Sequence, residues 1–320
     1  MRDKTKGYVY ILLTTVIFST MEVALKMVAG VFAPMQITVL RFFIGGICIL
    51  PFAAWTLRRR GVRLERRDFW YMAFTGLLCV PTSMVLYQLA EGSTLASVVA
   101  VVFSGNPIFV VPLAWLLFHE VIHKNNLLAL LFIVAGILAI ADPLHNQLSP
   151  VGVLLAVLAA VLFSFYLLLS RRITRKYGGM VTTCGSFLFG SLELFLILLM
   201  GWTGPGADFF AGVGLDLFCR VPFLEGINSA TLPYFLYICL VNSAMGFVCH
   251  QMALLYTDAK TVGLVFFFKP ALAPLLAWLA LGETVEPNML LGIGFFLAGS
   301  LVSLVPDMLR EKKQAREIWA

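Results

Sequence analysis

The chain has 320 residues, of which 60% are hydrophobic and 12% charged, and it carries a formal net charge of +6. Because soluble domains hold roughly 45–50% apolar residues, this composition excludes a water-soluble globule and indicates a polytopic membrane protein. The positive charge does not indicate nucleic-acid binding, since the basic residues lie in short segments beside apolar runs and fit contacts with anionic lipid headgroups.

Ten apolar segments approach the length of about 20 residues that a helix needs to cross the hydrocarbon core. They lack the period-two alternation of outer-membrane strands, so the predicted fold class is all-α. Residues 203–232 contain Asp216 and Arg220, and we interpret this stretch as an external loop that carries an interfacial helix. The ten predicted helices span 8–29, 34–56, 70–90, 94–118, 126–141, 150–170, 180–202, 233–256, 261–281 and 289–306.

An internal repeat relates the two halves of the chain at a constant offset of 163 residues. Near the N-terminus the offset becomes 145, so the halves differ by one insertion and the chain is a tandem duplication. The matched pairs include Gln88 with Gln251, Phe103 with Phe266, Pro107 with Pro270, Glu120 with Glu283 and, at the shorter offset, Phe18-Ser19 with Phe163-Ser164.

The repeat divides the chain into a first unit at 7–141 and a second at 150–306, followed by a basic tail at 307–320. Each unit holds five predicted helices. Because five is an odd number, the second unit enters the membrane from the opposite face. The duplication is therefore predicted to be an inverted repeat, a construction common among transporters.

Lysine and arginine positions predict the orientation, because retained cytoplasmic loops are enriched in both. The basic clusters at 2–6, 58–67, 171–176 and 310–316 all lie on one side of a ten-helix arrangement, and only Arg220 lies on the other. Both termini are therefore predicted to be cytoplasmic, in a protein of the cell (cytoplasmic) membrane. The first apolar segment has spanning length and no small-residue cleavage site, so it is predicted to remain as a helix.

Cysteine and histidine positions give no sign of a disulfide framework, a metal site or a cofactor. His119 and His123 are spaced i, i+4 but lack a third ligand, and of the six cysteines only Cys219 lies in a predicted external loop. No HExxH, GxSxG or acidic metal cluster occurs, so an enzyme is not predicted. Nothing in the sequence requires an oligomer.

Lys269 and Asn106 are the first candidates for a substrate site, because polar residues inside membrane helices are functional candidates by default. They occupy equivalent places in the repeat, and each precedes a proline. Pro270 lacks an N–H group and leaves a carbonyl one turn back without its helical partner. A cation beside such backbone could bind a carboxylate or phosphate, although Lys269 could also form a structural ion pair. Asn106 could orient a substrate or hold two helices together.

Glu22 is the candidate for a proton or a substrate ammonium group, because a carboxylate inside the membrane can carry a coupling proton. It could equally form a permanent bridge with Lys26 at spacing i, i+4, or with Lys269. Lys26 lies close enough to the predicted external surface to snorkel, so we interpret it as structural. His250 and Gln251 point about 100° apart on one helix, so one of them is expected to face a cavity.

Four further polar or aromatic features have weaker functional interpretations. Gln88 is the repeat mate of Gln251, which favours a symmetric packing role. Arg41 lies nearer the external side, where snorkelling or a headgroup contact would suffice, whereas Glu193 lies near the middle of its helix with an unknown partner. The run Phe266-Phe267-Phe268 could wall a pocket, but we interpret it as ordinary packing.

A family resemblance combines these features. Phe18-Ser19 to Lys26, Pro34, Leu40-Arg41-Phe42, Pro51, and Asn106-Pro107 through Glu120 with its echo at 270–283 resemble the EamA-type transporters of the drug/metabolite transporter (DMT) superfamily. The resemblance covers about 8–306. It implies ten helices in two inverted halves and a cavity lined mainly by helices 8–29, 70–90, 94–118, 150–170, 233–256 and 261–281.

By that resemblance Glu22, Asn106, His250, Gln251 and Lys269 lie on cavity-forming helices, whereas Arg41 and Glu193 lie on peripheral ones. The first-helix placement of Glu22 is similar to that of a proton-exchanging glutamate in smaller four-helix multidrug relatives. Lys269 departs from the usual pattern, because a positive charge in the site disfavours lipophilic cations.

The function predicted from the sequence is a membrane transporter, in particular an exporter, for small polar metabolites such as amino acids or related carboxylated compounds. It would work by alternating access around a site at the membrane midplane. The alternative is a proton-coupled exporter of drugs or aromatic compounds that uses Glu22 and the phenylalanines. A polytopic membrane enzyme is the less favoured third class.

Overall fold

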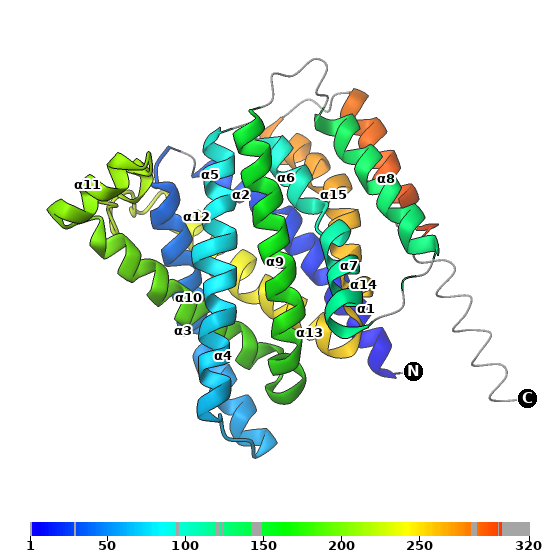
Figure 1. Ribbon diagram of the computed structural model, residues 1–320, viewed down its shortest axis with the longest axis horizontal. Helices are drawn as coiled ribbons and strands as arrows, with labels where there is room; N and C mark the ends of the chain where they lie inside the picture. Colours follow the sequence, from blue (N-terminus) through cyan, green and yellow to red (C-terminus); the bar gives the residue numbers. More distant parts are fainter. Residues whose placement is uncertain are drawn as a thin grey trace, which may run out of the picture.

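The computed structural model describes residues 2–28, 30–93, 96–119, 122, 124–141, 149–282, 287–299 and 301–302. Glu120, Glu283 and the predicted basic tail lie outside the described residues. Every regular element among the described residues is helical, as the composition predicts. Figure 1 shows the helices packed as a bundle, with α9 (Pro150–Tyr177) running through its middle and α11 (Gly204–Gly212) at one edge.

The first repeat contains five membrane helices, three of which are divided into shorter elements. Their bounds are α1 (Arg2–Ser19), α2 (Met21–Met27), α3 (Pro34–Arg60), α4 (Arg66–Leu77), η1 (Leu78–Met84), α5 (Val85–Ser93), α6 (Ala96–Ser104), α7 (Pro107–Phe118) and α8 (Lys124–Ala141).

The second repeat has the same plan with an additional segment between its second and third membrane helices. After α9 come α10 (Gly179–Met200), α11, η2 (Asp216–Phe218), α12 (Leu232–Leu236), η3 (Tyr237–Met245), α13 (Gly246–Tyr256), α14 (Ala259–Val262), α15 (Leu264–Leu281) and a last helix over Pro287–Gly299. The helix α11 and the turn η2 occupy the stretch interpreted from the sequence as an external loop.

Seven helices are long and apolar enough to cross a membrane, and three shorter apolar helices complete the set within the described residues. The shorter ones are Lys124–Ile140, Leu264–Ala280 and Pro287–Gly299. This result confirms the predicted all-α polytopic fold of ten helices in two repeats.

Several membrane helices are not regular, and the irregularities differ between the repeats. The first helix is interrupted at Thr20, the fourth at Gly105 and Asn106, and the ninth at Gly263. The Asn106 break precedes Pro107, whose ring cannot donate a backbone hydrogen bond. Sequence reasoning placed no break at Thr20 or Gly263.

Helices three and eight, which correspond in the repeat, each contain a π-helical stretch, η1 and η3. The offset of 163 maps residues 78–84 onto 241–247, so the two π-helical stretches overlap in the repeat. Such stretches are uncommon in proteins and often occur at functional sites. Pro81 interrupts the backbone hydrogen bonding of η1, whereas η3 contains no proline.

The two repeats pack closely where α4 meets α10. A Cβ atom at Gly76 would lie 2.7 Å from the carbonyl oxygen of Ser186 and 2.8 Å from the nitrogen of Gly190. Small residues at such positions let helix backbones approach, which is a main source of helix association in membranes. This glycine contact therefore joins the first repeat to the second.

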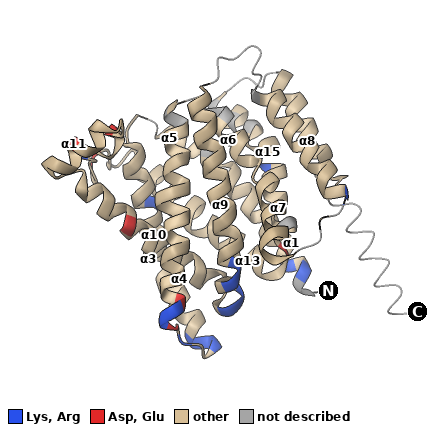
Figure 2. Cartoon of the chain, in the orientation of Figure 1, with Lys and Arg blue, Asp and Glu red and all other residues tan. Residues whose placement is uncertain are grey.

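Basic residues gather at one end of the bundle, which we call the basic end. Figure 2 shows them where α1 begins, where α4 begins and where α9 ends. Lys176 binds the carboxylate of Glu65 at 2.6 Å and also that of Asp68, and Tyr177 donates to Asp68 at 2.7 Å. These contacts hold the start of α4 and the residue before it against the end of α9.

A central pocket between the two repeats

A small pocket lies between the two repeats, where α1, α2, α3, α5, α6, α9, α13 and α15 meet around η1. Its volume is about 30 Å³. Ligand sites for small molecules measure roughly 300–1,000 Å³, so this pocket must enlarge before it can hold a metabolite. The structure is therefore a closed form. The lining residues are Phe18, Met21, Arg41, Met84, Tyr87, Phe103, Phe163, Phe247, Phe266 and Lys269.

The lining follows the internal repeat. The offsets of 145 and 163 relate three pairs of residues that all line the pocket, so the pocket lies where the two halves meet symmetrically. Two of these pairs are phenylalanines, and their rings contact across the centre, with 5.2 Å between the ring centroids of Phe103 and Phe163. The three pairs are Phe18 with Phe163, Met84 with Phe247, and Phe103 with Phe266.

Lys269 lines this pocket from α15 and is only 4% exposed. Its repeat mate Asn106 does not line the pocket. The Asn106 Nδ2 atom donates instead to the carbonyl of Ala160 at 3.0 Å and to the Ser164 hydroxyl at 2.8 Å, both on α9. The two equivalent positions therefore differ in role, because Lys269 faces the pocket while Asn106 bridges the break in the fourth helix to α9.

Arg41 is the residue whose place differs most from the sequence interpretation. It was expected on a peripheral helix, near enough to the outside to snorkel, but it is 3% exposed and lines the pocket together with Lys269. Its guanidinium lies 4.7 Å from the centroid of the Phe42 ring and contacts the sulfur atoms of Met21 and Met84. The snorkelling interpretation is therefore wrong, since the bundle encloses the side chain.

His250 lies directly behind the aromatic wall of the pocket. Its ring centroid is 5.9 Å from that of Phe18 and 6.1 Å from that of Phe266. The side chain is 1% exposed, and its Nε2 atom has no hydrogen-bond partner among the described residues. The offset of 163 makes His250 the mate of Tyr87, which lines the pocket itself.

Gln251 is fully engaged in packing. Its side-chain amide nitrogen, Nε2, donates to the hydroxyls of Tyr166 and Ser170, both at 3.0 Å. Its Oε1 atom accepts from the Thr174 hydroxyl at 2.8 Å. These partners all belong to α9, and Gln251 is completely buried away from the pocket. Of the two neighbours on α13, the structure places His250 beside the pocket and Gln251 in the contact with α9.

Comparisons with known proteins agree with this architecture. A model of the EamA-like transporter family matches residues 5–141 and 150–305. The chain belongs to this family. It is 33% identical over 306 residues to an uncharacterized transporter of Clostridium kluyveri, covering 93% of each chain.

This EamA-like transporter also matches more distant proteins of known name or known structure. The threonine/homoserine exporter RhtA of Escherichia coli is 24% identical over 288 residues, covering 88% of this chain and 85% of that protein. A solved crystal structure aligns with a TM-score of 0.70 at 18% identity, covering 94% of this chain and 97% of the other. The last match supports the fold alone. Together with the family match, these findings identify a multi-pass membrane transporter.

Four candidate residues of this EamA-like transporter remain, and none of them is among the residues that line the pocket. Glu22 and Lys26 are in the short helix α2, directly after the pocket-lining Met21, and their side chains lie outside the described residues. Gln88 is buried on α5. Glu193 is half-buried on α10, and its Oε2 atom is buried without a partner among the described residues. Neither Gln88 nor Glu193 lines the pocket.

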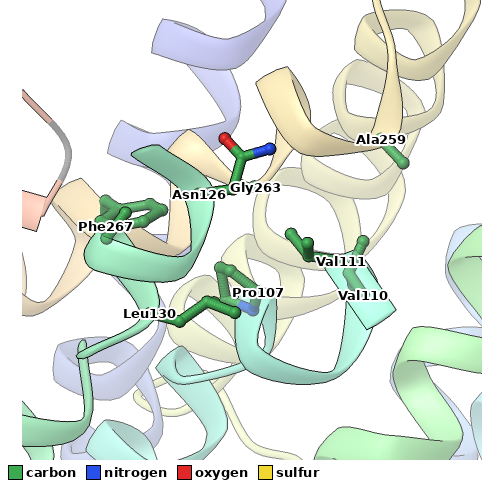
Figure 3. Close-up of a pocket in the computed structure, with 9 residues that line it drawn as sticks. Pro107, Val110, Val111, Asn126, Leu130, Ala259, Gly263 and Phe267 are labelled. Carbon is green, nitrogen blue, oxygen red and sulfur yellow. The ribbon is translucent and has the colours of Figure 1, made fainter. Parts of the chain in front are cut away.

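A second cavity of about 20 Å³ lies nearer the basic end, between α7, α8, α14 and α15. Figure 3 shows Asn126 among the otherwise apolar side chains that surround it. Phe267 lines this cavity and Phe266 lines the central pocket, so two members of the phenylalanine run interpreted as ordinary packing face cavities. The cavity adjoins Pro107 and Gly263, where the fourth and ninth helices are interrupted.

Sequence reasoning missed the part of Arg41 in the pocket, although a signal was available. The rule that selected Lys269, a cation within an apolar helix, applies equally to Arg41. The pairing of Met84 with Phe247 was also present in the offset of 163. The same rule applies to Asn242 in the predicted helix 233–256, whereas no sequence signal identified Thr20, whose contacts depend on the irregular helix geometry.

Proposed function

We propose that this transporter exports small carboxylated metabolites, amino acids among them, across the cytoplasmic membrane, with both termini in the cytoplasm. The observation that carries the proposal is the presence of two cations, Lys269 and Arg41, in the lining of one closed central pocket. Cations are costly inside a membrane protein and are retained there mainly for function. An anionic group on the substrate would interact favourably with both.

The roles follow from the chemistry of the lining. Lys269 and Arg41 bind the carboxylate of the substrate, and the phenylalanines contact its carbon skeleton. Glu22, which α2 carries beside the pocket-lining Met21, binds either a substrate ammonium group or a coupling proton. His250 is a second candidate for proton binding, because its imidazole lies directly behind the pocket wall.

Transport requires the pocket to open alternately to the two sides of the membrane. The pocket in this closed form is too small for an amino acid, so lining helices must move apart. The interruptions at Thr20, Asn106 and Gly263 provide places where segments of lining helices can change direction without breaking regular hydrogen bonding. We infer alternating access around the pocket between the two inverted repeats.

The relatives support both the substrate class and the direction. The Escherichia coli protein is named a threonine/homoserine exporter, so a protein of similar sequence moves small carboxylated compounds outward. At 24% identity this likeness supports a class of substrate and does not identify one compound.

A second candidate function is the export of aromatic compounds or drugs. Five phenylalanines and one tyrosine occur among the ten lining residues, and aromatic rings bind other aromatic groups well. The two cations nevertheless favour an anionic compound over a lipophilic cation. The two candidates therefore differ in whether removal of the cations abolishes transport.

The experiment is uptake by sealed everted vesicles containing the protein, with labelled amino acids and aromatic compounds as substrates. Lys269→Ala should abolish uptake of carboxylated substrates while membrane levels remain normal, and Lys269→Arg should retain part of it. Lys124→Ala removes an exposed lysine at the start of α8 and serves as the control. Wild-type transport by Lys269→Ala would refute the site assignment.

A further inference from the structure

A polar contact holds the break between α1 and α2. The carbonyl oxygen of Ile17 accepts hydrogen bonds from the Thr20 hydroxyl at 2.7 Å and from the Asn242 Nδ2 atom at 2.7 Å. Buried carbonyl groups need donors, which a regular helix supplies from its own backbone. Here the Thr20 backbone N–H lies at 3.3 Å, and the side chains of Thr20 and Asn242 add two shorter hydrogen bonds, so helix eight directly stabilises the break in helix one.

The Thr20 hydroxyl is the centre of this contact. It accepts a hydrogen bond from Asn242 Nδ2 at 3.1 Å and another from the Tyr237 hydroxyl at 2.9 Å. Tyr237 and Asn242 are five residues apart within η3. In an α-helix, residues five apart point about 140° away from each other. The i→i+5 hydrogen bonding of a π-helix brings them close to the same face. The π-helical form of η3 therefore allows both side chains to reach Thr20.

This contact lies beside two spaces. Phe18 and Met21, on either side of Thr20 in the sequence, line the central pocket. Thr20 and Tyr237 themselves line a surface groove of about 400 Å³ between α2, α12, η3 and α15. The groove lies along α2, at the end of the first helix that is distant from the basic end. The Thr20 contact thus lies between the closed pocket and a groove open to the surface.

We propose that the contact of Thr20 with Tyr237 and Asn242 is the barrier between the central pocket and this groove, and that conversion of η3 to α-helical form opens it. The inference rests on the proposed transport function. Conversion would rotate Tyr237 and Asn242 apart, so both hydrogen bonds to Thr20 would be lost together. The segment α2 could then move and join the pocket to the groove, which provides the route for substrate exit.

The closed arrangement leaves one buried acceptor of Asn242 without a donor among the described residues. The Oδ1 atom of Asn242 is buried and has no hydrogen-bond partner among the described residues. A buried acceptor without a donor disfavours the state that contains it. Asn242 therefore stabilises the break through its nitrogen and limits the stability of the closed form through its oxygen. We assign it as a positioning residue of the transport cycle.

The test measures access to the pocket. Met21→Cys is introduced into the full chain with its six native cysteines replaced, and a membrane-impermeant maleimide is applied from the side of the groove. Tyr237→Phe should raise the labelling rate about three- to fivefold, the change in the open population that loss of one hydrogen bond produces. Asn242→Leu should act in the same direction, because the loss of two donated hydrogen bonds outweighs the removal of one unpartnered acceptor.

Tyr234→Phe is the matched control. Tyr234 lines the same groove, but its hydroxyl makes no hydrogen bond with another described residue. In a Thr20→Val background, where the shared acceptor is absent, Tyr237→Phe should cause no further increase. Equal labelling rates in Tyr237→Phe and Tyr234→Phe would overturn the proposal, whether or not Asn242→Leu folds. Labelling needs no substrate, so this result in a protein that transports carboxylates refutes the barrier alone, whereas absent wild-type transport refutes the proposed function alone.

Discussion

Replacement of Gly76 by alanine tests the close approach of the two repeats at α4 and α10. The added methyl group would lie 2.7 Å from the Ser186 carbonyl oxygen, whereas ordinary contact begins near 3.4 Å. The three nearest atoms to this methyl group all belong to backbone, which cannot rotate away as a side chain can. The helices must therefore separate locally by roughly 0.7 Å, and overpacking of this kind costs about 1–3 kcal/mol.

The control for this substitution is Gly294→Ala in the last helix, where an added methyl group would meet nothing within 4 Å. Both variants gain the same higher helix propensity of alanine, about 1 kcal/mol, so their difference isolates the steric effect. The melting temperature of Gly76→Ala should therefore lie about 2–6 °C below that of Gly294→Ala, at roughly 2 °C per kcal/mol.

The assay is thermal unfolding of the purified protein in detergent, followed with a dye that becomes fluorescent on reaction with thiols. The buried Cys79, Cys184, Cys239 and Cys249 become reactive only when the bundle opens. Gly190→Ala should lower the melting temperature less in a Gly76→Ala background than in the wild-type protein. Helices already separated by one added methyl group can accommodate the second. Equal melting temperatures for Gly76→Ala and Gly294→Ala would show that α4 and α10 are not in close contact.

Three further substitutions test other parts of the structure. Gln251→Leu should lower the free energy of unfolding by about 1–3 kcal/mol, because the hydrogen bonds to α9 are lost. The KM for transport should stay unchanged. A raised KM in a variant of normal stability would show that Gln251 contributes to substrate binding. Tyr177→Phe removes the hydrogen bond donated to Asp68 and the one accepted from the Glu65 N–H at the basic end, and it should lower the free energy of unfolding by about 1–2 kcal/mol. An unchanged melting temperature would show that these contacts contribute nothing to stability. His250→Phe should preserve the melting temperature while lowering transport at least about tenfold, and full transport would make His250 a packing residue.

Much of the architecture was predictable because hydropathy and repetition are local properties of a sequence. The lengths of the apolar segments predicted the ten helices, and the constant offset predicted the two repeats. The offset also contained the pairs of residues that line the pocket, such as Phe103 with Phe266. Lys269 was identified by its charge alone, because few cations are retained in an apolar helix without a function.

The candidate site could not be assembled from those properties, because equivalent positions acquire different neighbours. Asn106 and Lys269 are repeat mates, yet Asn106 contacts α9 while Lys269 faces the pocket. Arg41 was assigned to the periphery because its helix is peripheral in related proteins, although the side chain reaches inward past Met21 and Met84. The direction of a long side chain depends on packing and not on its position along the helix.

The sequence by itself determined the membrane environment, the number of helices and the duplication, since each depends on residue type and spacing along the chain. Only the tertiary structure decided where the helices break and which polar groups meet. The physical reason is the requirement that every buried backbone group finds a partner. The Ile17 carbonyl accepts from nearby Thr20 and also from Asn242, which lies 225 residues away in the sequence, and no local sequence pattern predicts that second contact.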